Sequence, residues 1–205
     1  QMDNPLLNIA DLPPFQGIKP EHMEPAVDHL LKDAHTRIDA LLNSGGPYDW
    51  DSLMNPLEDI QDGLNRAWSP VSHMNSVVNT DTLRDAYNAC LPKLSEYSTD
   101  LGQNETLYNA YRQIADSEHY AGLDTAQRKI IENALRDFRL SGVALDPEKR
   151  ERYKVIMQEL SSLHSKFEEN ILDATNTWKK LITDESELSG LPESARSLAK
   201  QTAER

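Results

Sequence analysis

One long amphipathic segment, residues 146–178, limits the folds open to this chain more than any other feature. Asp146-Pro147-Glu148 is typical of a helix start, with an N-cap aspartate and a proline at the first helical position. No glycine or proline interrupts the segment after Pro147, so the pattern predicts one helix about 50 Å long at 1.5 Å per residue. Its apolar residues recur with steps of three and four, at Tyr153, Ile156, Leu160, Leu163, Phe167, Ile171, Ala174 and Trp178. A one-sided stripe of this length needs a covering surface, and we expect the upstream helices to provide it.

The upstream sequence predicts a nearly all-α fold, a bundle of long antiparallel helices. Helical apolar periods with caps or stops run over residues 20–41, 51–75, 81–101, 105–114 and 125–138. Gly45-Gly46-Pro47 and Gly142 are the expected stops of the first and fifth helices. Pro70 is expected to kink or divide the second helix, and Pro92 to bend the third.

Three parts are expected along the chain. Residues 1–19 form an extended, proline-rich arm packed on the body, residues 20–178 the helical bundle, and residues 179–205 a short strand, a turn and the start of a further helix. The strand, Leu181-Ile182-Thr183, has no visible partner, and an unpaired strand is a liability in a complete domain. We therefore expect its partner downstream of Arg205, in a longer protein. Gln1 before Met2 has the pattern of an added residue.

Composition excludes some classes of partner. The 205 residues carry a net charge of −13, which opposes binding to nucleic acids and to anionic membranes. An acidic surface that favours basic peptides stays open as an alternative. There is no apolar run near the roughly 18 residues that a membrane span needs, and no secretory signal. A single cysteine, Cys90, fits a reducing compartment, so a cytoplasmic location is expected.

The sequence predicts no catalytic residue and no metal ligand within this chain. None of the six histidines is followed by glutamate, so the His-Glu-x-x-His motif of helical zinc sites is absent. His164 with Glu168, and His29 with Asp33, are spaced as pairs, but two ligands do not make a site. Cys90 lies beside an apolar stripe, so we expect a small buried residue rather than a nucleophile.

One polar stretch, residues 68–76, is unusual for a packed helix. It gathers serine hydroxyls, an imidazole and an amide around Pro70. A structural interpretation is a helix break whose freed carbonyls are satisfied locally. The functional interpretation is a polar patch facing a peptide, with His73 and Asn75 as hydrogen-bond partners in a substrate channel.

Nine blocks spread in order through nearly the whole chain carry a family resemblance. They include Ser69-Pro-Val-Ser-His-Met-Asn-Ser-Val and Asn170-Ile-Leu-Asp-Ala-Thr-Asn-Thr-Trp. Together they occupy residues 4–7, 12–15, 18–22, 69–77, 94–99, 133–142, 170–178, 181–185 and 188–194. These blocks resemble the start of zinc oligopeptidases of the thimet oligopeptidase and neurolysin family.

The resemblance implies a protein roughly three times this length, in which two mostly helical halves flank a deep, narrow channel. Zinc, a His-Glu-x-x-His helix and a further glutamate then lie in the carboxyl-terminal part, and no position here matches them. This chain would form a wall of the channel that admits only short, unstructured peptides, including signal-peptide fragments. Its implied partners are those peptides and the catalytic part of the same polypeptide. Without that part it is expected to be inactive and to bind no zinc.

Two alternatives belong to other classes. In the first alternative, the chain is a free-standing helical module that binds a protein or peptide and has no enzymatic activity. A metal-binding bundle in its own right would need ligands that converge from three helices.

Overall fold

The computed structural model describes residues 4–9 and 11–204; Gln1, the expected added residue, lies outside this range. The chain forms two compact units, which divide between Ser165 and Lys166. The division falls inside the long helix α6 (Pro147–Thr177), which contributes its first part to one unit and its last part to the other.

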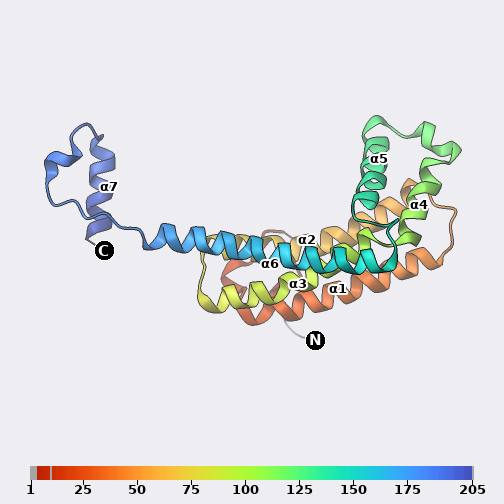
Figure 1. Ribbon diagram of the computed structural model, residues 1–205, viewed down its shortest axis with the longest axis horizontal. Coiled ribbons are helices and arrows are strands. Elements are labelled where there is room, and N and C mark those ends of the chain that lie inside the picture. The colour runs from red at the N-terminus through yellow and green to blue at the C-terminus, as the bar shows by residue number, and fades with distance from the viewer. Residues whose placement is uncertain (1–3, 10, 205) are drawn as a thin grey trace. The chain divides into compact units, whose positions relative to one another are not determined.

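Regular structure in the described part of the first unit is entirely helical, which confirms the all-α class. The longer helices are α1 (Pro20–Asn43), α2 (Asn55–Val77), α3 (Asp81–Gly102), α4 (Glu105–Ala115), α5 (Thr125–Leu140) and the start of α6. Short 3₁₀ or π turns precede or join them: η1 (Pro5–Leu7), η2 (Phe15–Gly17), η3 (Trp50–Met54) and η4 (Glu118–Gly122). Helix α1 packs against α2 and α3, and α4 packs against α5 as a pair at one end of the other three (Figure 1).

Local capping explains why these helices begin and end where they do. The side chains of Thr80, Asn104 and Asp124 each accept a hydrogen bond from a backbone N–H in the first turn of α3, α4 and α5. These bonds satisfy donors that a helix start leaves without an intrahelical partner. Gly45 and Gly142 have φ of 75° and 87°, a left-handed conformation that glycine adopts readily, and both follow helix ends as predicted.

Pro70 lies inside α2 without dividing it. The helix continues from Asn55 to Val77, and Pro70 is buried within its packed face. Of the two expected effects, division of the helix is therefore wrong, whereas a kink at Pro70 stays a prediction. A proline removes one backbone hydrogen bond, but burial of Ala67, Val71 and Met74 around it holds both sides of the helix in place.

The described part of the amino-terminal arm, residues 4–9 and 11–19, contacts the helices near both of its ends. Leu6 and Ile18 are 3% and 5% exposed, and η1 packs against α1 and α2. Asn4 is also buried; its Oδ1 accepts from the backbone N–H of Leu6, and its Nδ2 donates to the carbonyl of His22. Between these ends, Leu12 is 89% exposed.

The first part of α6 is attached to the first unit by polar side chains. The Nζ atom of Lys154 lies 2.8 Å from Glu96 and 3.1 Å from Asp100, both on α3. These hydrogen bonds, the one to Glu96 foremost, raise the pKa of Lys154. Buried Ser165 donates to Oδ1 of Asn88 on α3 at 2.9 Å. Helix α6 therefore turns a polar side toward α3.

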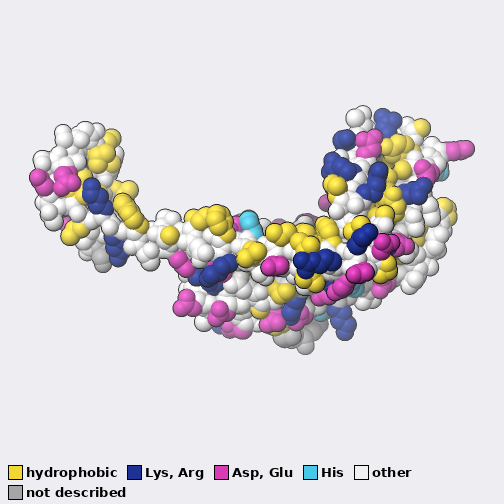
Figure 2. Space-filling view, in the orientation of Figure 1, with side chains coloured by type: hydrophobic (Ala, Val, Ile, Leu, Met, Phe, Trp, Pro, Cys, Tyr) yellow, Lys and Arg dark blue, Asp and Glu magenta, His cyan; other side chains and the backbone are white. Residues whose placement is uncertain are grey.

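The apolar stripe of α6 is correspondingly exposed. Ile156, Leu160 and Leu163, which we call the outer stripe, are 39%, 52% and 58% exposed. Figure 2 shows hydrophobic side chains along the visible side of this helix. The expectation that the upstream helices bury the stripe is therefore wrong for these residues, because charged and hydroxyl groups make the contacts with α3.

The second unit contains the end of α6, the 3₁₀ turn η5 (Glu185–Leu188) and α7 (Glu193–Ala203). Its α6 residues Phe167 and Ile171 are 63% and 52% exposed. The strand expected at residues 181–183 is absent from the described residues, because no neighbouring segment offers it a hydrogen-bonded ladder. No described helix of either unit is long and apolar enough to cross a membrane.

Candidate functional site

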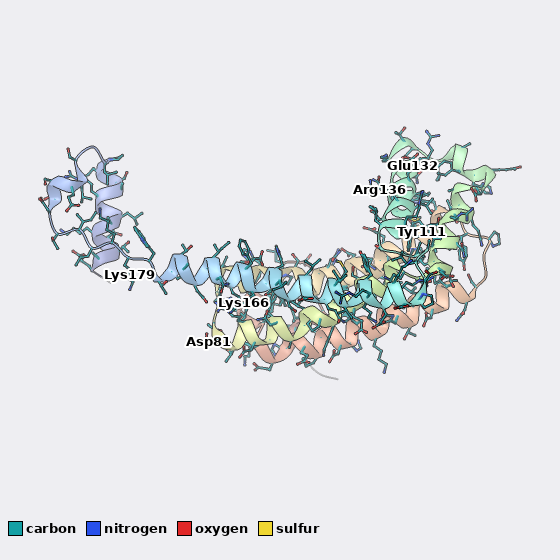
Figure 3. All side chains as sticks on the ribbon, viewed as in Figure 1. Asp81, Tyr111, Glu132, Arg136, Lys166 and Lys179 are labelled. Atoms are coloured by element: carbon teal, nitrogen blue, oxygen red, sulfur yellow. The ribbon has the colours of Figure 1, made fainter. Side chains whose placement is uncertain are left out.

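A cavity of about 300 Å³ lies among α2, α3, α4 and α5 of the first unit. Its lining is mostly apolar, with polar groups at Glu58, Gln61, Ser98, Tyr111, Asp137 and Ser141. The ring of Tyr111 packs edge-on against Phe138, with 5.3 Å between the ring centroids. Figure 3 shows Tyr111 near the base of the α4–α5 pair. The cavity is thus an apolar hollow with a phenol in its wall.

The electrostatics of this cavity further disfavour ionisation of the phenol. Burial raises the pKa of Tyr111 to about 12, and the negative charge of Glu58 adds to the effect. The hydroxyl is a hydrogen-bond donor at neutral pH, as that of an ordinary tyrosine also is. Asp137 pairs with Arg136 at 2.7 Å, and both side chains are more than half exposed. The cavity offers an apolar surface, a neutral donor and carboxylates, and the carboxylates oppose the binding of an anion.

His73 lies in a second hollow, of about 610 Å³, between the amino-terminal arm and α2. Its imidazole is exposed and lies 5.9 Å from the ring of Phe15 between centroids. In the same lining, Arg66 Nε and Asp62 Oδ2 are 2.6 Å apart. The hollow combines an aromatic ring, an imidazole and a salt bridge.

Asn75 does not line this hollow. Its side chain and its backbone carbonyl both accept hydrogen bonds from Nδ2 of Asn79, at 3.0 and 2.8 Å. Oδ1 of Asn79 accepts in turn from Nε of Arg84 on α3, so Asn75 takes part in the junction between α2 and α3. Residues two apart on a helix lie about 160° apart around its axis, nearly on opposite sides. The structure therefore does not bring Asn75 and His73 together.

The described residues do not fit a zinc site. No three His, Cys, Asp or Glu side chains among them form a group that could hold a metal ion. A catalytic zinc needs three protein ligands. The two spaced pairs noted in the sequence supply two each, and Asp33 of one pair forms an ion pair with Arg37 at 3.5 Å.

Cys90 is a buried structural residue, as predicted. It is 0% exposed, and burial raises the pKa of its thiol to about 11, with a smaller contribution from Glu24. The thiolate is the reactive form of cysteine, and at neutral pH this thiol is protonated and enclosed. Cys90 therefore fills space in the core between α1 and α3.

Sequence reasoning did not find the Tyr111 cavity. Its walls come from four helices, and none of the contributing segments carries a local motif. The only available signal is a tyrosine on an apolar helix face, since a buried hydroxyl usually has a polar neighbour. That signal does not distinguish a cavity from a filled core.

Comparison with known families defines the kind of domain to which this helical fold belongs. Residues 27–150 match the profile described as "Neurolysin/Thimet oligopeptidase, N-terminal domain", a helical domain of a family of peptidases. The match extends over more than half of the chain. The chain belongs to the neurolysin/thimet oligopeptidase family.

Its relatives are much longer proteins. Oligopeptidase A of Salmonella typhimurium is 53% identical over 203 residues, which are 99% of this chain and 30% of that protein. Oligopeptidase A of Haemophilus influenzae is 54% identical and that of Escherichia coli is 52% identical. Each of these matches also covers 99% of this chain and 30% of the relative. The chain therefore spans about 30% of the length of these relatives, and it matches the amino-terminal domain of the family.

Proposed function

We propose that this chain is the amino-terminal, non-catalytic part of a zinc-dependent oligopeptidase that acts on short peptides in the cytoplasm, signal-peptide fragments among them. The observation that carries the proposal is the 53% identity to an oligopeptidase A along 99% of the chain. The match to an amino-terminal domain supports the assignment of this part. Zinc is assigned to the remainder of the polypeptide, because the described residues offer no set of three ligands.

The proposed role of this part is to form one wall of the channel that peptides enter. A wall built from packed helices excludes folded proteins and orients an extended peptide, and positioning of this kind contributes to catalysis without a reacting group. The two hollows supply chemistry suited to peptides: apolar surface for side chains, and the Tyr111 hydroxyl and His73 imidazole for backbone carbonyls. The net charge of −13 favours peptides with basic residues.

Size selectivity of the complete protein tests this proposal. The complete protein should cleave an internally quenched peptide of about ten residues. It should cleave the same sequence at least about 100-fold more slowly when a small folded domain holds it in a loop, because the channel excludes the fold. Unfolding the host domain should restore cleavage. Equal rates on the folded and free sequences would contradict a channel wall, and no cleavage of the free peptide would contradict a peptidase.

His73 and Asn75 are proposed as contacts of the peptide in this channel. For His73→Ala in the complete protein we expect KM for a short peptide to rise about 2- to 10-fold at unchanged kcat, the signature of one lost binding interaction. His29→Ala is the matched control: it removes another exposed imidazole, from α1 and outside both hollows, and should leave KM unchanged. An equal rise in KM for the two variants would contradict the proposal that His73 contacts the peptide. For Asn75, contact is proposed through its Nδ2 group, because Oδ1 already accepts from Asn79.

A further inference from the structure

The two sides of α6 are reversed with respect to an ordinary surface helix. The side that meets α3 carries Lys154 and the buried Ser165. At about 100° per residue, Ile156 and Ser165 lie nine positions and therefore about 180° apart around the helix axis. The outer stripe thus faces directly away from α3.

The exposed outer stripe requires another apolar surface to cover it. A surface helix normally buries its apolar side and exposes its polar side. Here three consecutive stripe positions, Ile156, Leu160 and Leu163, are 39% to 58% exposed while serine and lysine face inward. Contiguous exposed apolar surface of this kind marks an interaction site.

We infer that the outer stripe is an internal docking surface, covered by the carboxyl-terminal part of the same polypeptide. The inference rests on the proposed function, in which that part is the catalytic one. The matched family domain is amino-terminal, and the greater part of each relative's length lies outside the matched stretch. A covalently attached partner is present at high effective concentration and covers the stripe permanently. In this arrangement α6 is a central helix, held to α3 by polar bonds on one side and to the rest of the protein by apolar packing on the other.

Two other occupants fit the observations less well. A second copy of the chain would bring together two bodies of net charge −13, which repel each other. A peptide substrate would cover the stripe only while bound and would leave three large apolar side chains in water the rest of the time.

Cysteine labelling of the complete protein tests the inference. Leu163→Cys is introduced with the other accessible cysteines replaced, and its rate of modification by a maleimide is compared with that of the same protein unfolded in guanidinium. Protection of at least about 100-fold is expected for a covered site. Ser162→Cys is the matched control, since Ser162 is exposed and lies about 100° around the helix from Leu163, toward the α3 side. We expect it to react within about tenfold of its unfolded rate.

Each result has one meaning for the docking surface. Protection of Leu163→Cys without peptide and at all protein concentrations supports the inference, provided that Ser162→Cys reacts near its unfolded rate. Equal protection of the two cysteines overturns the assignment of the docking surface to the outer stripe. Rapid labelling of Leu163→Cys, protection that appears only on adding peptide, or protection that disappears on dilution overturns it. Peptidase activity is measured on the same samples. Rapid labelling of Leu163→Cys in an active enzyme rejects the docking surface alone. Protection of Leu163→Cys, together with an inactive wild-type protein, rejects the proposed function alone.

Discussion

Residues 1–205 alone should hydrolyse a short peptide no faster than the background rate of the assay. The complete protein should cleave the same peptide at least about 10⁴-fold faster. The reason is that the described residues lack the protein ligands that a catalytic metal ion needs. Zinc-assisted hydrolysis needs a metal held by three protein ligands that leave a position for water. The described residues of this chain bring no such group together, and the thiol of Cys90 is enclosed and protonated. A peptide bound to the described helices would therefore meet neither a metal-activated water nor a reactive thiol of these residues.

A fluorogenic oligopeptide assay with added zinc measures both proteins at equal concentration. A chelator should abolish the activity of the complete protein, and added zinc should restore it, because the metal supplies the polarisation of water. The short chain should give the background rate under all three conditions. Turnover that co-elutes with the short chain on gel filtration would contradict the prediction and would place reacting groups within these helices.

The helices could be predicted from sequence because their ends depend on residues close to them. Asn104 and Asp124 cap α4 and α5 from the adjacent position, and Gly142 ends α5 within two residues. Apolar spacing indicated the length of each helix in the same local way. That Pro70 does not divide α2 could not be predicted, because the outcome depends on packing from other helices, which local sequence does not contain.

The orientation of α6 could not be predicted from its own pattern. An apolar stripe indicates which side of a helix needs cover but not which neighbour provides it. The inward side is determined by Glu96 and Asp100, which bind Lys154, and by Asn88, which binds Ser165; all three acceptors lie more than fifty positions upstream. Long-range polar pairs of this type have no periodic signal.

The candidate site was predictable only in part for a related reason. The sequence drew attention to His73 and Asn75 because they lie in one polar stretch, yet nearness along a helix does not place two side chains on one surface. His73 lines a hollow with the arm, and Asn75 is engaged at the next helix junction. The Tyr111 cavity lies where four helices meet, so the sequence of no single segment predicts it.

Ile131→Ala should lower the free energy of unfolding by about 2 to 5 kcal/mol, the cost of removing buried methyl and methylene groups and leaving a cavity. Ile131 is 0% exposed and lies on α5, which packs against α4 in the first unit. The same substitution at its neighbour, Ile130→Ala, is the matched control, because Ile130 is 47% exposed. It should change the free energy of unfolding by less than about 1 kcal/mol.

The comparison isolates burial because both changes replace the same residue type at adjacent positions of one helix. Any gain in helix propensity from isoleucine to alanine, a few tenths of a kcal/mol, is common to both variants and cancels in the difference. Urea unfolding followed by far-ultraviolet circular dichroism supplies the two midpoints and slopes. If Ile130→Ala destabilises the chain as much as Ile131→Ala, then α5 does not present the side of Ile131 to α4, and the cavity lined by Ala134 and Phe138 of the same helix loses its structural basis.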